Sequence, residues 1–256
     1  MNGTLLELKS VSKVFGGLTA VDDLSFQVPA GGHIKSMIGP NGAGKTTVLN
    51  MVAGVLKPTS GEILVGTERA SHLETHQVAR LGIARTFQNV NLFPNMSVLE
   101  NVMVGCHSRS GKGLLRSALR APSQKREERW VIEQALEKLR LVGLAGHSPE
   151  MATSLPFGMQ RLLEIARGLA SEPRLFLLDE PASGLSAREV MSLAEVLAKI
   201  IAKGITILLV DHDMQFVMDI SDEVVVLDGG RKIAEGPPLQ VQNDPHVVAA
   251  YLGEGD

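Results

Sequence analysis

The sequence predicts an α/β fold with an N-terminal antiparallel β subdomain and an inserted α-helical subdomain. Three observations lead to this prediction. Residues 5–87 are rich in short strand-like segments, helical spacing dominates residues 89–167, and strand–helix alternation returns after Pro173. The apolar run at residues 175–178 is typical of a central parallel strand covered on both faces. We expect one domain over residues 1–256, with a core of 1–88 and 168–256 and a helical subdomain of 89–167.

The predicted strands are short apolar segments bounded by turn residues. Before the helical subdomain they lie at residues 5–15, 21–28, 34–38, 61–65 and 83–87. After it they lie at residues 175–178 and 205–210, with a closing hairpin at 224–227 and 232–234.

The predicted helices are marked by capping residues and by apolar stripes. Ser97 and Glu100 form a capping box for a helix that runs through Val104, and Ser186 and Glu189 cap a later one. The later helix carries one apolar stripe: Val190, Leu193, Ala194, Leu197, Ile200 and Ile201. Within a charged segment, four further residues recur at roughly helical spacing: Trp130, Ile132, Leu136 and Leu139.

Composition narrows the class of protein. The chain has 256 residues, of which 44% are hydrophobic and 21% charged, as in ordinary globular proteins. Its formal net charge of −3 argues against nucleic-acid binding, which usually needs a basic face. The single cysteine, Cys106, excludes an internal disulfide and fits a reducing cytosol.

No stretch of the sequence predicts a membrane span. Apolar runs such as residues 205–210 are far shorter than the roughly 20 residues that a spanning helix needs. The N-terminus lacks the charged and apolar regions of a signal peptide. We therefore expect that any role at a membrane depends on a partner.

The segment Gly39-Pro40-Asn41-Gly42-Ala43-Gly44-Lys45-Thr46-Thr47 fits the pattern G-x-x-x-x-G-K-[ST] between a predicted strand and a predicted helix. Its glycines let successive backbone N–H groups turn towards a phosphate chain, and the helix N-terminus adds positive potential. Lys45 is expected to reach the β- and γ-phosphates, and the Thr46 hydroxyl to bind Mg²⁺. The pattern predicts ATP binding by a P-loop NTPase (RecA-like) core.

Two acidic residues, Asp179 and Glu180, directly follow the predicted apolar strand at residues 175–178. Asp179 lies where the carboxyl end of that strand would meet the phosphate loop, and it can hold Mg²⁺ through water. The side chain of Glu180, the next residue, points in a different direction from that of Asp179, so Glu180 can act as the general base for the attacking water. We therefore expect ATP hydrolysis.

The phosphate loop and the strand that ends in Asp179 and Glu180 resemble two motifs of ABC-type ATPases. Four further segments resemble the remaining motifs, and all six occur in the order that the family has. Leu155-Pro156-Phe157-Gly158-Met159-Gln160-Arg161 resembles the family's signature motif. The others are Phe87-Gln88 for the glutamine loop, Ala182-Ser183-Gly184-Leu185-Ser186 for the D-loop and Val210-Asp211-His212-Asp213 for the histidine switch. The resemblance covers essentially the whole chain.

The resemblance implies roles for further residues. Phe15 would stack on adenine, Gln88 would touch Mg²⁺ and the attacking water, and His212 would hydrogen-bond the γ-phosphate. It also implies a head-to-tail homodimer or heterodimer in which the partner's signature residues complete each nucleotide site. Those residues in this chain are Phe157, Gly158, Met159 and Gln160.

Three positions depart from the family pattern. Pro156 replaces the common signature serine, and Ser186 stands where the D-loop commonly carries an aspartate. Lys35 lies in the strand before the phosphate loop, where an uncharged residue is usual; either its ammonium extends to the sheet edge, or the lysine is a peculiarity of this chain.

Within the family, the chain looks like the ATPases of branched-chain amino acid importers. The stretches concerned are residues 15–18, 85–88, 92–93, 105–129 and 250–254. The segment 105–129 is basic, and its two interpretations are contact with anionic lipid and a solvated loop. The resemblance implies membrane permease partners and a place on the cytoplasmic face of the cell membrane. Importers of urea, amides or other solutes, and a soluble ABC-type ATPase acting on nucleic acid or ribosomes, are the alternatives.

Overall fold

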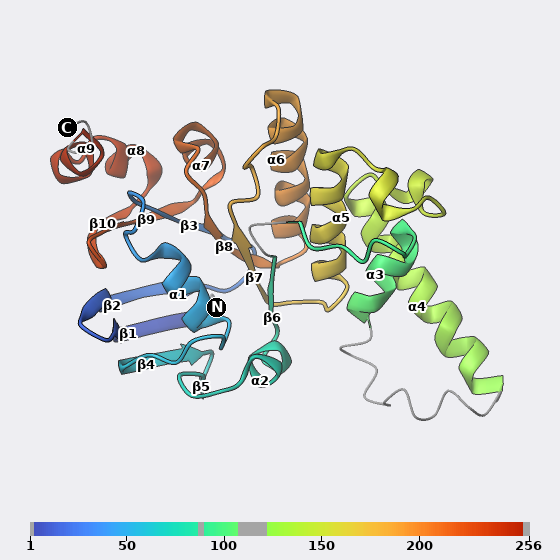
Figure 1. The fold of residues 1–256 in the computed structure, drawn as a ribbon, viewed down its shortest axis with the longest axis horizontal. Coiled ribbons are helices and arrows are strands. Elements are labelled where there is room, and N and C mark those ends of the chain that lie inside the picture. The colour runs from blue at the N-terminus through green and yellow to red at the C-terminus, as the bar shows by residue number, and fades with distance from the viewer. Residues whose placement is uncertain (1–2, 87–89, 107–121, 253–256) are drawn as a thin grey trace. The chain divides into compact units, whose positions relative to one another are not determined.

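The computed structural model describes residues 3–86, 90–106 and 122–252. The chain divides into two compact units (Figure 1). The first comprises residues 1–85, 174–184 and 197–256, and the second comprises 86–173 and 185–196.

The first unit contains all the strands with assigned bounds. They are β1 (Thr4–Phe15), β2 (Leu18–Pro29), β3 (Ile34–Ile38), β4 (Ser60–Val65), β5 (Glu68–Arg69), β6 (Ile83–Arg85), β7 (Leu175–Asp179), β8 (Thr206–Val210), β9 (Glu223–Asp228) and β10 (Arg231–Gly236). Its helices are α1 (Lys45–Val52), α2 (Thr75–Arg80), α7 (Met214–Ile220), α8 (Pro238–Gln242) and α9 (Pro245–Leu252).

These strands form two sheets of different character. The smaller sheet is antiparallel, with strand order β2-β1-β4-β5. The larger has the order β10-β9-β3-β8-β7-β6, and all its neighbours pair in parallel except β9 and β10. Every residue of β3, β7 and β8 is buried, as expected for strands covered on both faces. The α/β class and the N-terminal antiparallel sheet predicted from the sequence are confirmed.

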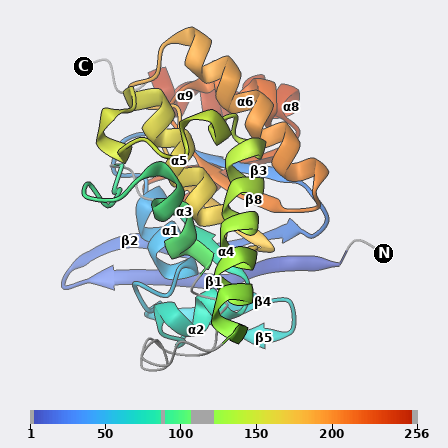
Figure 2. The same ribbon diagram turned by 90° about the vertical axis from the view of Figure 1, so that its right-hand side faces the viewer.

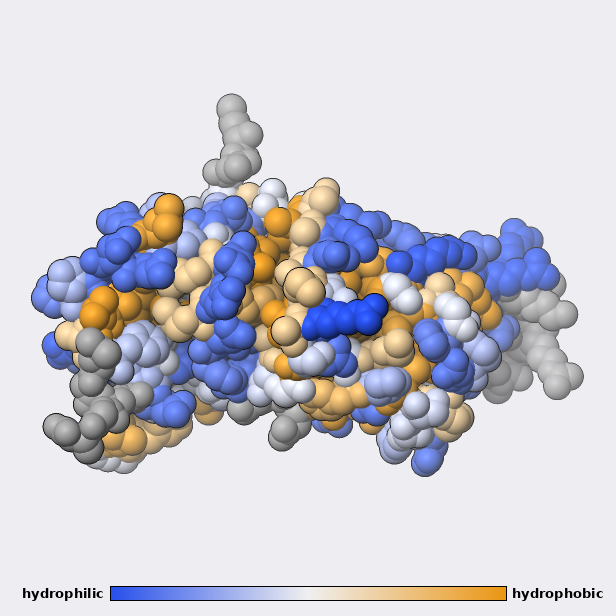
Figure 3. All heavy atoms as spheres, turned by 90° about the horizontal axis from the view of Figure 1, so that it is seen from above, coloured by the Kyte–Doolittle hydropathy of each residue, from blue (hydrophilic) through white to orange (hydrophobic). Residues whose placement is uncertain are grey.

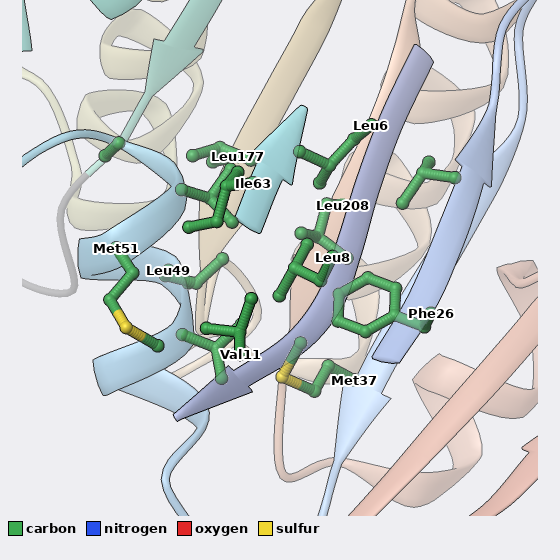
Figure 4. Packing of buried hydrophobic residues seen from close by; sticks show 14 of the residues in the cluster. Leu6, Leu8, Val11, Phe26, Met37, Leu49, Met51, Ile63, Leu177 and Leu208 are labelled. Atoms are coloured by element: carbon green, nitrogen blue, oxygen red, sulfur yellow. The ribbon is translucent and has the colours of Figure 1, made fainter. Parts of the chain in front are cut away.

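The main hydrophobic core of this unit joins the two sheets and helix α1. Figure 4 shows Leu6 and Leu8 of β1 with Phe26 of β2, close to Leu208 of β8. Leu49 belongs to the same buried cluster from the side of α1. The packing therefore anchors the helix that follows the phosphate loop to both sheets.

The second unit is helical. It contains α3 (Val98–Cys106), α4 (Pro122–Leu141), α5 (Phe157–Leu169) and two short 3₁₀ turns, Ala145–His147 and Ala152–Ser154. Helix α3 packs against both α4 and α5 (Figure 2). Helix α6 (Ala187–Ala202) begins in this unit and ends in the first.

The predicted helix caps are present. The Ser97 N–H donates to Glu100 Oε2 at 2.8 Å, and the Glu100 N–H donates to Ser97 Oγ at 3.2 Å, which forms the predicted capping box of α3. At the start of α6, both the N–H and the hydroxyl of Ser186 donate to Glu189 Oε2, at 2.8 and 2.7 Å.

The helix indicated by the spacing of Trp130, Ile132, Leu136 and Leu139 is present as α4, and of these four residues Leu139 is fully buried. The side chains that α4 buries most deeply include Val131, Ala135 and Leu139, which are spaced by four residues, whereas Trp130 is 41% exposed. Successive residues of a helix differ by about 100° in direction, so Trp130 lies off the face that Val131 defines.

Hydrophilic and hydrophobic residues are interspersed over the face drawn in Figure 3. Single exposed apolar side chains such as Leu18 and Leu239 are ordinary on protein surfaces. Among the described residues, no helix combines the length and the apolar character that a transmembrane span requires.

Lys35 is buried, with 1% of its surface exposed, and its ammonium reaches a glutamate on the edge strand β10. Its Nζ donates to the Gln27 carbonyl of β2, to Glu223 Oε2 of β9 at 2.7 Å and to Glu235 Oε1 of β10. The Phe26 ring lies 5.6 Å from the ammonium. One lysine thus links the antiparallel sheet to the edge of the parallel sheet.

The charge of Glu235 depends on this cluster. Burial would raise the pKa of the Glu235 carboxyl, but hydrogen bonds from Lys232 and Lys35 outweigh burial and hold the pKa below its usual 4.5. A carboxyl with a lowered folded-state pKa stabilises the fold above its unfolded pKa. That contribution is lost as the pH falls through the folded pKa.

We predict that Lys35→Met lowers the free energy of unfolding by about 3–5 kcal/mol near neutral pH, because it takes the buried cation away from two partly buried carboxylates and leaves Glu235 with Lys232 alone. Urea unfolding measures the change, with Lys9→Met as the exposed control. The difference from wild type should shrink as the pH falls below 4.5. A variant as stable as wild type at pH 7 would contradict a stabilising role for the cluster.

Candidate functional site

The phosphate loop occupies residues 39–44, between β3 and α1. Gly39 and Gly44 both have positive φ, 149° and 98°. A Cβ on Gly39 would lie 2.0 Å from the Leu227 carbonyl oxygen, and one on Gly44 would lie 2.5 Å from that of Ala20. Both positions require glycine for conformation and for space, so the backbone can fold into a tight cradle there.

Lys45 begins helix α1 and points back over the loop. Its Nζ donates to the carbonyl oxygens of Gly39 at 2.6 Å and Pro40 at 2.8 Å, and the residue is 9% exposed. This places the ammonium inside the curve of the loop. Thr46 is exposed, so its hydroxyl is accessible beside the helix N-terminus.

Asp179 is the last residue of β7 and is 3% exposed. Arg85, the last residue of β6, donates from Nη2 to Asp179 Oδ2 at 2.9 Å. The same guanidinium donates from Nη1 to Asn50 Oδ1 of α1 at 2.6 Å. Sequence reasoning assigned no role to Arg85 or Asn50, because the contacts join residues that are far apart in the chain.

Glu180 has a left-handed backbone, with φ of 48°. Its N–H donates to the Val210 carbonyl at 2.7 Å, which holds the residue beside the end of β8. Its Oε2 lies 3.6 Å from Nδ1 of His212, whose side chain is 62% exposed. A strained non-glycine backbone of this kind is common at functional sites and costs about 1–3 kcal/mol.

Asp211 organises the turn that carries His212. Its carboxylate accepts the N–H groups of Ala182 at 3.0 Å, His212 at 2.8 Å and Asp213 at 3.1 Å. Burial raises the pKa of Asp211 above its usual value, and these hydrogen bonds partly offset the effect. Sequence reasoning included Asp211 in a motif without giving it this positioning role.

The sheet register brings these groups to one edge. Met37 and Asp179 both pair with Val210, so β3, β8 and β7 end at the same level. The carboxyl ends of neighbouring parallel strands therefore present the phosphate loop, Asp179, Glu180 and His212 together. Such an edge can bind a phosphate chain, hold a divalent cation and place a base near them.

Phe15 ends β1 and is 44% exposed, with the Lys13 ammonium 5.0 Å from the ring centroid. Nearly half of the residue is therefore open to solvent. The contact between Ala20 and Gly44 shows that the strand following Phe15 runs beside the phosphate loop.

The predicted signature residues 157–160 begin α5 in the second unit. Gly158 is buried, and a Cβ on it would lie 2.3 Å from Glu189 Oε1. Phe157 is 47% exposed, Met159 is half-buried and Gln160 Nε2 donates to the Leu155 carbonyl at 2.9 Å. The predicted role of Gln88 falls outside the described residues.

Comparison with known proteins identifies the family. Residues 21–183 match the ABC transporter family model, and residues 231–256 match the model of the branched-chain amino acid ATP-binding cassette transporter. The chain belongs to the ABC transporter family of ATP-binding proteins.

Curated relatives match over the whole length. The chain is 42% identical to the high-affinity branched-chain amino acid transport ATP-binding protein LivG of Escherichia coli K12, over 99% of this chain and 100% of the relative. BraF of Pseudomonas aeruginosa, which carries the same description, matches with the same identity and coverage. A probable LivG of Archaeoglobus fulgidus is 32% identical, over 98% of this chain and 96% of the relative.

Solved structures show the same fold. An ATP-binding cassette of an ABC transporter in its ADP conformation superposes with a TM-score of 0.85 at 29% identity, covering 98% of this chain and 99% of the other. A dimeric cassette in a post-hydrolysis state with ADP and Pi gives 0.74 at 25% identity, covering 91% and 98%. These matches confirm the predicted P-loop ABC fold. The chain is thus an ATPase whose hydrolysis is coupled to transport.

Proposed function

We propose that this chain is the Mg²⁺-dependent ATPase subunit of an importer for branched-chain amino acids. The observation that carries the hydrolytic part is the shared strand edge. There, the phosphate loop, Asp179 and Glu180 follow neighbouring parallel strands that end at one level. The transport part rests on the family and on the C-terminal match at residues 231–256.

ATP binding is assigned to residues 39–47 and Phe15. The backbone of the loop would surround the phosphates, and the Lys45 ammonium would exchange its two carbonyl partners for phosphate oxygens. The exposed ring of Phe15 would stack on adenine.

The donor set fits Mg²⁺, which prefers oxygen ligands and usually keeps several waters. The Thr46 hydroxyl, the Asp179 carboxylate and the Gln88 side chain would hold the ion, directly or through water. When bound, Mg²⁺ neutralises charge on the phosphate oxygens.

Glu180 is assigned as the general base. It would accept a proton from the water whose oxygen bonds to the γ-phosphorus, while the bond from that phosphorus to the β,γ-bridging oxygen breaks. His212, with its Nδ1 3.6 Å from Glu180 Oε2, would donate a hydrogen bond to the γ-phosphate. ADP and phosphate are the products.

The N-terminus of α5 is assigned to a second nucleotide site. Residues 157–160 would bind the γ-phosphate held by a partner cassette, because free N–H groups at a helix N-terminus attract anions. The relative captured as a dimer with ADP and Pi supports such pairing. The partner in this dimer would be either a second copy of this chain or a homologous cassette.

The remaining partners would be integral membrane permease subunits, which would hold the chain at the cytoplasmic face of the membrane. A place to receive them is the loop at residues 91–96. Buried Asn101 fixes this loop by accepting the Phe93 N–H at 2.9 Å. The Phe93 ring is 42% exposed, and the Arg167 guanidinium lies 5.5 Å from its centroid.

We predict that Glu180→Gln retains ATP binding but lowers the turnover rate by about 10²- to 10⁴-fold, which is the rate acceleration that a positioned general base usually contributes. Steady-state phosphate release and fluorescent ATP binding measure the two effects. Lys45→Ala should instead weaken binding and turnover together. Wild-type turnover by Glu180→Gln would remove Glu180 from the mechanism.

We predict that ATP dimerises the Glu180→Gln variant, because hydrolysis no longer removes the nucleotide that joins the two cassettes. Sedimentation velocity with ATP, with ADP and without nucleotide tests this. A variant that stays monomeric with ATP at high protein concentration would contradict a homodimer and leave only pairing with a homologous cassette.

We predict that Leu92→Ser combined with Phe93→Ser preserves the basal ATPase rate of the isolated chain but abolishes transport-coupled stimulation in the reconstituted transporter. The reason is that Phe93 is exposed and Leu92 is half-buried, so a docked partner would cover apolar surface that both side chains leave open. Normal transport would refute docking through this loop. Loss of basal activity and stability would show that the pair packs against its own unit instead.

A further inference from the structure

A buried ion pair at the strand edge points to a role for Arg85. Arg85 and Asp179 end the neighbouring parallel strands β6 and β7, where Arg85 pairs with Leu177, two residues before the aspartate. Their side chains are only 10% and 4% exposed, and Nη2 lies 2.9 Å from Oδ2. The carboxylate is therefore neutralised by a fixed cation that water screens little.

The same guanidinium reaches the helix that carries the phosphate-loop lysine. Nη1 donates to Asn50 Oδ1 at 2.6 Å, and Asn50 lies five residues beyond Lys45 in α1. The planar fork of arginine can satisfy two acceptors in fixed directions, which a lysine ammonium does not reproduce. Arg85 thus ties the orientation of Asp179 to the position of α1.

We propose that Arg85 is the internal counter-ion of Asp179: a positioning residue that stabilises the carboxylate without metal and weakens its attraction for a divalent cation. The proposal rests on the assignment of Asp179 to Mg²⁺ made above. A guanidinium and a metal ion that share one carboxylate oppose each other electrostatically. The pair therefore tunes cation affinity downwards, while keeping the carboxylate in place between turnovers.

The test uses Mn²⁺ as the probe cation, titrated by electron paramagnetic resonance in the presence of ADP at fixed ionic strength. Arg85→Gln removes the charge but keeps a hydrogen-bond donor, and Arg85→Lys keeps the charge but loses the fork. We expect Arg85→Gln to bind Mn²⁺ about three- to tenfold more tightly than wild type. Arg85→Lys should stay within about twofold, because it keeps the charge.

Metal-free unfolding in urea with EDTA supplies a second readout. Arg85→Gln should lower the unfolding midpoint, because it leaves a buried carboxylate without its counter-ion. Adding Asp179→Asn should restore much of the loss, and Mn²⁺ with ADP should raise the midpoint of Arg85→Gln more than that of wild type. Arg231→Met, which breaks the exposed ion pair with Asp22, is the matched control and should change neither readout appreciably.

The outcomes separate this proposal from the proposed function. If Asp179→Asn leaves Mn²⁺ affinity unchanged, Asp179 does not hold the metal and both assignments fail. If Asp179→Asn weakens binding while Arg85→Gln binds Mn²⁺ no more tightly than wild type, the metal assignment stands and the counter-ion role is overturned. Should Arg85→Gln fail to fold, tighter Mn²⁺ binding by Arg85→Lys would overturn the proposal, because that variant keeps the charge.

Discussion

The parallel pairing of β3, β8 and β7 is the constraint on which the nucleotide site depends. The three strands are buried along their whole length, and Val210 of β8 pairs with Met37 on one side and Asp179 on the other. A slip of one residue in either pairing would reverse the faces of a buried strand and move its end relative to the others. The geometry of the site is thus held by core packing as well as by polar contacts.

Charged groups reinforce this arrangement where apolar packing ends. Arg85 and Asn50 connect the ends of β6 and β7 to α1, and Asp211 gathers three backbone N–H groups around the end of β8. On the other flank, Lys35 connects β3 with β2, β9 and β10. These contacts are buried or partly buried, so the loss of one would leave a charge or a donor poorly solvated.

Much of the fold could be predicted because its signals are local. Three such signals are the loop pattern at residues 39–47, the apolar run before Asp179 and the helix caps, and each of them consists of residues within a few positions of one another. The comparisons confirm the family that these motifs indicated. The assignments of individual site residues stay predictions, although the structure brings Lys45, Asp179, Glu180 and His212 to one edge.

The features that could not be predicted depend on contacts between residues that are far apart in the sequence. Arg85 and Asp179 are 94 residues apart, and Lys35 and Glu235 are 200 apart. A lysine in a strand next to the phosphate loop looks anomalous until its two distant glutamates are known. The spacing of residues 130–139 indicated the helix α4, but the face that it buries, with Val131 and Ala135, is set by packing against other elements.

The left-handed backbone of Glu180 has a consequence for how the chain can be altered. A glycine would adopt that conformation without strain, so a position at odds with conformational preference is also the one assigned to proton transfer. Selection for heat resistance alone would favour relieving the strain and would discard the base. In engineering this protein, rigidity and turnover are opposing objectives at residue 180, and a stability screen needs a parallel assay of hydrolysis.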